Sequence, residues 1–526
     1  MHIPWSRTAL STLAVAALSA GLAPAAASAS AASHSLAPNT RFYIPPPSSG
    51  AVQQIVGLLA SGQGHNAALI AKMETVPSAV WLDGETQAEA AMGPQGSVQA
   101  DKRVAQQVHA ALLGASLEHA VPVFVAYNIP GRDCSQYSAG GAPSDSAYDA
   151  WINSLSSALG TAKAVVILEP DALANLPGYC GSAYNTAFPN ITNTTRINDV
   201  AYGVHTLEGD PNISLYLDGG HSAWQAVGNI AEVLVAADVQ QAQGFFLNVS
   251  NYQYATNNDY YGTWVSSCIA LATQVSGETQ ASALGYAATL TSADNSPSGA
   301  FGNCPNQYWN GGPATSWSGT AMSPYGVWSE IQNDPNNPDP LNAAGLDSNY
   351  ASMLNGVVPS THFVVDTSRD GQGPNNMQAY AAAPYDQPAN VISTLQGGNW
   401  CNPPGSGLGL RPTANTASVT NSLDSYLPAN TSLLDAYLWV KTPGQSDGQC
   451  DIAGGVRAWQ DYVSAGSGGG YTPPIAGWPT SSSSNWTTFD PLWSLQTGKV
   501  LTDPAAGAWF PAQALQLAQD ANPALP

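Results

Sequence analysis

The chain has 526 residues and carries 35 acidic against 13 basic side chains, a formal net charge of −22 at pH 7. So acidic a surface repels nucleic acid and anionic lipid, and we expect neither as a partner. Only 9% of the residues are charged and 44% are hydrophobic, so the chain can bury a large core. Past the first residues no stretch is long and apolar enough for a membrane helix.

Residues 1–33 have the layout of a secretory signal peptide. A short start with Arg7 leads into an apolar stretch around Ala9 to Ala23, and small residues come after it at Ala27 to Ala29. We therefore predict a secreted, extracellular protein. Residues 34–526 exceed the usual domain length, but α/β barrels with insertions pass about 400 residues as one unit, so we predict a single domain.

Six short apolar runs end abruptly in polar or acidic residues, as buried parallel strands do. They are Val121–Tyr127, Ala164–Leu168, Ser214–Leu217, Gly244–Leu247, His362–Val365 and Leu438–Val440. Between them, Asp145 to Leu159 and Ile230 to Gln243 carry apolar residues at helical spacing. Strand alternating with helix predicts a parallel α/β barrel or a doubly wound sheet.

Residues 251–348 depart from this rhythm and are rich in Asn, Gly, Ser, Tyr and Trp. We interpret them as a long insertion that Cys268 and Cys304 could staple. A Gly- and Ser-rich stretch at Ser464 to Gly470 resembles a linker only locally, and the chain beyond it is too short for an independent module.

The six cysteines are even in number and come after an export signal, which favours disulfides over metal sites. No C-x-x-C pair, no H-E-x-x-H and no clustered histidines occur, so we expect no metal and no cofactor. No G-x-S-x-G elbow follows a strand, which argues against a serine hydrolase.

Aspartates follow the apolar runs at the points where a parallel α/β fold places its site. They are Asp133, Asp171, Asp218, Asp366 and Asp447. A single aspartate there is ordinarily a helix cap or turn former, but five that converge suit glycosidic cleavage. That reaction needs one protonated and one ionised carboxyl group, and crowding raises carboxyl pKa values.

Aromatic residues stand beside the same strand ends, at Trp81, Tyr127, Trp224 and Trp400. Sugar rings stack on such side chains, although core packing is the ordinary role of a tryptophan. His221 could be a ligand or base, and a buried, hydrogen-bonded histidine is the alternative.

Seven internal segments and the C-terminal end resemble glycoside hydrolase family 6, the inverting cellobiohydrolases and endoglucanases. The segments are Tyr127–Cys134, Ile167–Leu176, Tyr216–Trp224, Asn248–Tyr252, Val365–Arg369, Trp400–Gly405, Trp439–Gly444 and the ending from Gly507 to Pro523. The resemblance runs from about Phe42 to the C-terminus. It implies a distorted α/β barrel of seven parallel strands, TIM-like, with long loops that roof an active-site cleft or tunnel.

By the same resemblance, Asp171 takes the place of the general acid, Asp133 tunes its pKa and relays a proton through water, and Asp447 matches the usual candidate for the base. The implied substrate contacts come from Trp81, Tyr127, Asp218, His221, Trp224, Asn251, Trp400 and Lys441. Implied disulfides join Cys134 to Cys180 and Cys401 to Cys450, which leaves Cys268 with Cys304. Gln445 departs from the family, where glutamate is common.

The resemblance implies a cellulase that acts on cellulose and cello-oligosaccharides. No Pro/Thr-rich linker flanks the domain, so we expect no carbohydrate-binding module, and we expect a monomer. The insertion at 251–348 and a loop from Asp370 to Asn399 that could close a tunnel favour an exo-acting cellobiohydrolase. An endo-β-1,4-glucanase is the alternative, and a non-catalytic carbohydrate-binding protein is a third hypothesis. The aromatic residues leave xylan or a mixed-linkage glucan open as substrates.

Overall fold

The fold is given by a computed structural model. It describes residues 36–84, 89, 91–135, 137–294, 296–308, 342–375, 377–382, 389, 392, 400–417, 426–428, 431–449, 476–477 and 490–526. The predicted signal peptide, the linker-like stretch from Ser464 to Gly470 and Cys450 lie outside the described residues. The same holds for most of the expected tunnel-closing loop beyond Ala382.

Seven parallel strands form one sheet in chain order, which confirms the expected architecture. The strands are β1 (Val80–Asp83), β2 (Val123–Tyr127), β3 (Ala164–Leu168), β4 (Ile213–Asp218), β5 (Gly244–Leu247), β6 (His362–Asp366) and β7 (Leu434–Leu438). The neighbouring strands pair in parallel, for example Ile167 opposite Tyr216. Because every strand runs the same way, all their carboxyl ends meet at one end of the sheet.

The sheet curls into a distorted barrel whose two edges meet near β1 and β7. In the described part of the chain no strand ladder pairs these edges. Instead, the Ala79 N–H donates to the Trp439 carbonyl at 2.9 Å, and the Trp81 indole donates to the Val440 carbonyl at 2.8 Å. The seam is therefore closed beside Trp81 by two hydrogen bonds that Ala79 and Trp81 donate to the chain that continues β7.

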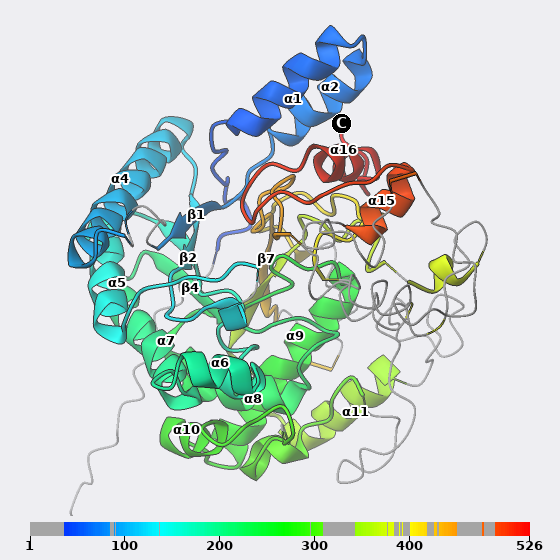
Figure 1. The fold of residues 1–526 in the computed structure, drawn as a ribbon. Helices are drawn as coiled ribbons and strands as arrows, with labels where there is room; N and C mark the ends of the chain where they lie inside the picture. Colours follow the sequence, from blue (N-terminus) through cyan, green and yellow to red (C-terminus); the bar gives the residue numbers. More distant parts are fainter. Residues whose placement is uncertain are drawn as a thin grey trace, which may run out of the picture. The chain divides into compact units, whose positions relative to one another are not determined.

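Helices surround the strands, as Figure 1 shows. The main ones are α4 (Pro94–Glu118), α5 (Asp145–Leu159), α7 (Asn193–Leu207), α8 (Val227–Ala236), α9 (Ala255–Ala270), α10 (Gln280–Ala287) and α11 (Asn342–Leu354). α1 (Ser49–Ala60) and α2 (Gly64–Met73) pack against α16 (Pro511–Gln519) through Ala51, Ile70 and Leu517. Shorter elements are α6 (Ser182–Ala187) and α15 (Pro491–Thr497).

Alternate strand residues face two different cores. Val125, Ile167 and Tyr216 belong to the smaller cluster, which consists mainly of strand residues. Phe124 and Val166, one position away, belong to the large cluster that strands and helices share. This alternation follows from the period of two in a strand, and burial on both faces explains why the strands are continuous apolar runs in the sequence.

The first and last strands differ from the sequence expectations. β7 is Leu434–Leu438 rather than Leu438–Val440, because its interior carries Asp435, a buried acid that breaks the apolar run. β1 was missed because only Leu82 in it is fully buried.

The helix expected from Ile230 to Gln243 is α8, Val227–Ala236. It ends before Asp238, whose left-handed φ of 61° breaks the helical path. The predicted helix from Asp145 to Leu159 matches α5 and is capped by Ser144, whose side chain accepts from the Ala147 N–H.

The stretch predicted to be an insertion carries regular structure where it is described. Helices α9, α10 and α11 lie in or overlap it, and a disulfide joins Cys268 of α9 to Cys304. The Cys268 and Cys304 side chains are both buried, and residues 309–341 lie outside the described part. The disulfide therefore ties the end of α9 to the segment that follows α10.

A buried acid links three strands. Asp435 of β7 accepts hydrogen bonds from the Tyr216 hydroxyl at 2.6 Å and from Gln243 Nε2 at 2.7 Å. The other carboxylate oxygen of Asp435 lies 2.8 Å from Nδ1 of His362, which is the first residue of β6. Burial works against a charged imidazole, but the hydrogen bond and charge of Asp435 outweigh it and raise the pKa of His362.

We predict that His362→Gln destabilises the protein more at low pH than at high pH. Because the folded pKa of His362 is raised above 6.5, the stabilisation by the pair is fully present below pH 6.5 and is lost as pH rises through the folded value. The free energy of unfolding should fall by roughly 1–3 kcal/mol at low pH. Thermal melts of both proteins between about pH 5.5 and pH 8.5 measure this, and a constant difference would contradict it.

Candidate active site

Three carboxyl groups gather where β2, β3 and β4 end. Asp133 lies in the loop after β2, Asp171 lies in the loop after β3, and Asp218 is the last residue of β4. The buried Asp218 carboxylate accepts hydrogen bonds from the backbone N–H groups of Leu173 and Ala174, at 3.0 and 2.8 Å. Because these donors closely follow Asp171 in the chain, Asp218 fixes the loop that carries Asp171.

The surroundings push these carboxyl groups toward their neutral forms to different extents. Burial raises the pKa of Asp171 well above its ordinary value, and the charges of Asp218, Asp133 and Asp447 raise it further, in that order. Burial also raises the pKa of Asp133 to about 6, against the hydrogen bond that its carboxylate accepts from the Ser138 N–H at 2.7 Å. Asp171 therefore has the stronger tendency of the two to keep its proton, whereas Asp133, with a pKa of about 6, is mostly ionised at neutral pH.

Asp447 is held in the opposite state by its donors. Arg369 binds its two oxygens at 2.9 Å each, and Lys441 Nζ lies 3.1 Å from Oδ1. The Tyr252 hydroxyl and the Asn402 N–H donate to Oδ2 at 3.2 and 3.0 Å. Burial opposes the charge of Asp447, but Arg369 and Lys441 outweigh it and lower its pKa to about 2. Asp447 is therefore a permanent anion at ordinary pH.

Asp366, the last residue of β6, lies at the same end of the sheet, and its carboxylate is engaged by the backbone. Its carboxylate accepts four backbone N–H groups, from Ser250 at 3.2 Å, Ser368 at 2.9 Å, Val440 at 3.1 Å and Lys441 at 2.9 Å. These donors lie in the segments that follow β5, β6 and β7. Asp366 therefore ties three strand ends together.

Two of the predicted aromatic residues meet beside the acids. The rings of Trp81 and Tyr127 pack edge to face with centroids 5.3 Å apart. Lys441 Nζ lies 5.6 Å from the centroid of the Trp81 ring and also contacts Asp447, so the aromatic pair adjoins the ionised carboxylate. The Tyr127 phenol is buried, and its pKa is raised by burial and by the charge of Asp171.

His221 and Trp224 form a second aromatic contact, with ring centroids 5.5 Å apart. Burial lowers the pKa of His221 to about 3, so its imidazole is neutral. Its Nδ1 accepts a hydrogen bond from the Ala223 N–H at 3.2 Å, which leaves Nε2 as the protonated nitrogen. A neutral donor of this kind can contact a sugar hydroxyl and is a poor base.

The two remaining predicted contacts lie on other loops. Trp400 packs against Tyr137 with ring centroids 5.7 Å apart, between β6 and β7 in the chain. Asn251 follows β5, and its Oδ1 accepts from the Tyr252 N–H at 3.0 Å. Both side chains are partly exposed.

A cavity of about 280 Å³ opens beside the barrel seam. Its wall combines Trp81 with the polar side chains Glu74, Asp83 and Gln445, together with Ser48 and Thr442. An indole face beside hydrogen-bonding groups is a lining that suits a sugar ring. Gln445, the departure from the family resemblance, is thus part of this wall.

The loops that carry the acids adopt strained backbone conformations. Asp133, Cys134, Glu169 and Asp171 all have φ values between 45° and 66°, in the left-handed region that side chains rarely occupy. The Glu169 side chain is fully buried and accepts from the Asn128 and Ile129 N–H groups. Such conformations persist only when the surroundings fix them, which is typical of functional loops.

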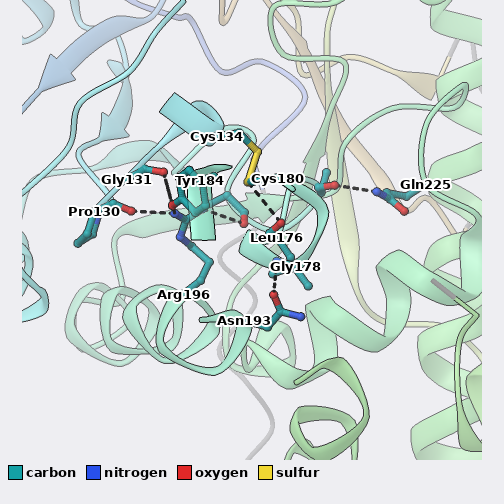
Figure 2. The surroundings of a disulfide bond; sticks show 12 residues. Pro130, Gly131, Cys134, Leu176, Gly178, Cys180, Tyr184, Asn193, Arg196 and Gln225 are labelled. Atoms are coloured by element: carbon teal, nitrogen blue, oxygen red, sulfur yellow. Dashed lines mark hydrogen bonds between the residues drawn. A yellow bond between two sulfur atoms is a disulfide. The ribbon is translucent and has the colours of Figure 1, made fainter. Parts of the chain in front are cut away.

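A disulfide crosses between the same two loops, as Figure 2 shows. It joins Cys134, directly after Asp133, to Cys180, which follows β3. Cys401 is also disulfide-bonded, and its predicted partner Cys450 lies outside the described residues. The covalent link therefore ties the Asp133 side of the site to the Asp171 side.

Arg369, Tyr252 and Glu169 were not predicted as site residues, although each contacts an acid or a loop of the site. Arg369 follows β6 within Asp366-Thr367-Ser368-Arg369, and a cation so close to a strand end was a signal that could have found it. Glu169 directly follows the run Ala164–Leu168, so the same signal could have found it, whereas Tyr252 carried no charge to mark it. Among the described residues, no group of three or more His, Cys, Asp or Glu side chains could hold a metal ion.

The fold and these carboxyl groups define a parallel α/β barrel with an acid cluster at the carboxyl ends of its strands. The sequence profile of glycosyl hydrolases family 6 matches residues 37–478. The chain therefore belongs to glycosyl hydrolases family 6.

No helix in the described parts of the chain is long and apolar enough to cross a membrane.

Curated relatives carry two kinds of name. The 1,4-beta-D-glucan cellobiohydrolase C of Emericella nidulans is 26% identical over 510 residues, which cover 92% of this chain and 77% of the relative. Endoglucanase 1 of Streptomyces halstedii is 26% identical over 83% of this chain and 91% of its own. Endoglucanase A of Thermobispora bispora is 26% identical over 67% of this chain, and the match spans about half of that relative, 49%.

Solved structures share the fold. A glycoside hydrolase family 6 enzyme from Coprinopsis cinerea superimposes with a TM-score of 0.51 at 18% identity, over 93% of this chain and 98% of its own. Cellobiohydrolase II from Humicola insolens, solved in complex with glucose and cellotetraose, gives a TM-score of 0.50 at 19% identity, over 92% and 98% of the two chains.

We predict that Arg369→Met is strongly destabilising because it leaves the buried Asp447 carboxylate without its main counter-charge. The free energy of unfolding should fall by roughly 3–5 kcal/mol. Asp447→Asn removes the charge that needs compensation, so the double variant should lose clearly less than the sum of the two single losses. Urea denaturation of the four proteins measures the coupling, and additive losses would contradict a direct ion pair.

Proposed function

We propose that the protein is a secreted cellulase that hydrolyses β-1,4-glucosidic bonds with inversion. The observation that carries the proposal is the opposed protonation of neighbouring carboxyl groups. The pKa of Asp171 is raised by burial and by three acids, while Arg369 and Lys441 hold Asp447 ionised. Glycosidic cleavage needs a proton donor and carboxylates that stay charged, and this end of the barrel provides both.

In the proposed mechanism, Asp171 gives its proton to the leaving glycosidic oxygen as the bond to the anomeric carbon breaks. A water molecule attacks that carbon from the opposite face and loses a proton, so the product has the inverted configuration. The permanent anion Asp447 stabilises the positive charge that develops on the sugar ring.

Asp133 is the better acceptor for the proton that the water loses. The pKa of Asp133, raised by burial, is about 6, whereas the Asp447 carboxylate has a pKa of about 2 and its oxygens are already occupied by donors. We therefore assign the base role to Asp133 acting through water, and transfer of that proton back to Asp171 completes the cycle. The role that the family resemblance gave to Asp447 becomes electrostatic.

The substrate contacts proposed for cellulose and cello-oligosaccharides follow the aromatic residues. Trp81 and Tyr127 lie beside Lys441, and the cavity next to Trp81 offers hydrogen-bonding side chains around an indole. Trp224 with His221 and Trp400 with Tyr137 supply two further platforms. Asp218 and Asn251 complete the proposed contacts.

We propose exo action that releases cellobiose, with an endo-β-1,4-glucanase as the alternative. The long segment between β5 and β6, which carries α9 and α10 and the Cys268–Cys304 disulfide, supports exo action, because extra chain after a barrel strand can extend a wall of the site. The long match to the Emericella cellobiohydrolase also supports exo action, whereas the Streptomyces relative named endoglucanase favours the alternative.

The disulfides and the predicted signal peptide support secretion, and we propose that the enzyme acts as a monomer.

We predict that Asp171→Ala lowers kcat on cello-oligosaccharides by ~10²–10⁴-fold, the usual size of general acid catalysis. Hydrolysis of a cellobiosyl substrate whose leaving group needs no proton should be largely spared. Steady-state kinetics on both substrates measure the difference. Equal losses on both would mean that Asp171 holds the substrate or the fold and donates no proton.

The proposed function is tested first by proton NMR of the purified protein acting on cellohexaose. We expect the α-anomer to appear before mutarotation, because inversion converts the β-linkage into an α-hydroxyl. Cellobiose as the dominant product supports exo action, and mixed lengths support the endo alternative. A β-anomer as the first product would overturn the inverting mechanism. Binding of cellohexaose without cleavage would show that the protein is a non-catalytic carbohydrate-binding protein.

A further inference from the structure

One buried guanidinium lies beneath both loops that carry the proposed acid and its neighbour. Arg196, on α7, is only 2% exposed. Its Nη2 donates to the carbonyls of Pro130 and Gly131, at 2.7 and 3.2 Å, in the loop that leads to Asp133. Its Nη1 donates to the Ala172 carbonyl at 3.5 Å, in the loop that carries Asp171.

Tyr184 completes this contact from α6. Its hydroxyl donates to the Gly131 carbonyl at 2.7 Å and accepts from Arg196 Nη2 at 3.4 Å. Figure 2 shows Arg196, Tyr184, Pro130 and Gly131 converging on one side of the Cys134–Cys180 disulfide. The guanidinium thus directs its buried donors to backbone carbonyls of the two loops.

We propose that Arg196 is a positioning residue that clamps the Asp133 loop against the Asp171 loop and so fixes the separation of the two carboxyl groups. The inference rests on the proposed function, because it requires Asp171 to be the proton donor. Arg196 touches neither substrate nor the reacting atoms in this proposal. It acts through the backbone of the two loops.

A guanidinium suits this role because its planar fork presents several donors in fixed directions. One such group can hold carbonyls on both loops, whereas a lysine ammonium is a flexible point charge that cannot reproduce the fork. The strained backbone at Asp133 and Asp171, with φ values of 54° and 66°, needs an outside restraint of this kind.

The clamp affects catalysis through the coupling of the two acids. The negative charge of Asp133 contributes to the raised pKa of Asp171, after burial and the charge of Asp218. If the Asp133 loop moves away, that contribution weakens and water reaches Asp171, so its pKa falls. Activity that needs protonated Asp171 is then lost at a lower pH.

The test compares the pH profiles of Arg196→Lys and Tyr184→Phe with the wild type on cellohexaose. We expect the alkaline limb of kcat/KM to move down by about half a pH unit or more in Arg196→Lys, a loss of ~3-fold or more on that limb. KM should stay within about twofold, because subsite residues are unchanged. Tyr184→Phe removes one hydroxyl and should shift the alkaline limb less, in the same direction. This variant still tests the proposal if Arg196→Lys does not fold.

Asn193→Ser is the matched control. Asn193 is another buried polar residue of α7, 4% exposed. Its side chain hydrogen-bonds to Gly178, near the Cys180 end of the segment after β3, and to Ala287 and Leu290, and none of these bonds involves the backbone at 130–131 or 172. It should lower the melting temperature while leaving the alkaline limb in place.

The outcomes separate the inference from the proposed function. An alkaline limb that stays at its wild-type position in both test variants, or that moves equally in Asn193→Ser, would overturn the positioning role alone. A wild-type protein that does not cleave cellohexaose would overturn the proposed function and this inference with it. A shift confined to Arg196→Lys and Tyr184→Phe supports the clamp.

Discussion

The ion pair between Arg369 and Asp447 sets the electrostatic balance on which the site depends. It is buried, its two hydrogen bonds are 2.9 Å long, and Lys441 adds a second positive charge. A carboxylate held ionised in this way cannot take a proton to relieve crowding among its neighbours. The pKa of Asp171 is raised mainly by burial and then by the charges of Asp218, Asp133 and Asp447, and the fixed charge of Asp447 is thus one part of this balance.

The barrel supplies the framework for this balance because its parallel strands bring backbone donors and acids to one end. Asp218, Asp366 and Glu169 all accept backbone N–H groups at strand ends. Each bond satisfies a buried carboxylate and at the same time fixes a loop. The acids at this end of the barrel therefore form two groups. Asp366 and Glu169 hold loops in place, Asp133, Asp171 and Asp447 are available for the proposed chemistry, and Asp218 both holds a loop and is a proposed substrate contact.

Membership of glycosyl hydrolases family 6 establishes the barrel fold, but it does not establish whether the enzyme is exo- or endo-acting. Relatives named cellobiohydrolase and endoglucanase are both 26% identical to this chain, so overall similarity does not separate exo from endo action. That difference depends on how the loops cover the substrate, whereas the strands belong to the shared architecture. The proposal of exo action depends on the long segment between β5 and β6 and on the long match to the Emericella cellobiohydrolase.

The sequence by itself determined the strands with continuous apolar runs, such as Ala164–Leu168, and the helix Asp145–Leu159, because local periodicity encodes them. It also pointed to Asp133, Asp171, Asp218 and Asp447, because parallel strands collect the residues after them at one end. Only the tertiary structure decided that the pKa of Asp171 is raised while that of Asp447 is lowered, and that backbone N–H groups bind Asp366. It also revealed the contacts of Arg369 and Arg196. Protonation and clamping depend on burial and on partners that are distant in the chain, and these arise only when the loops pack against each other.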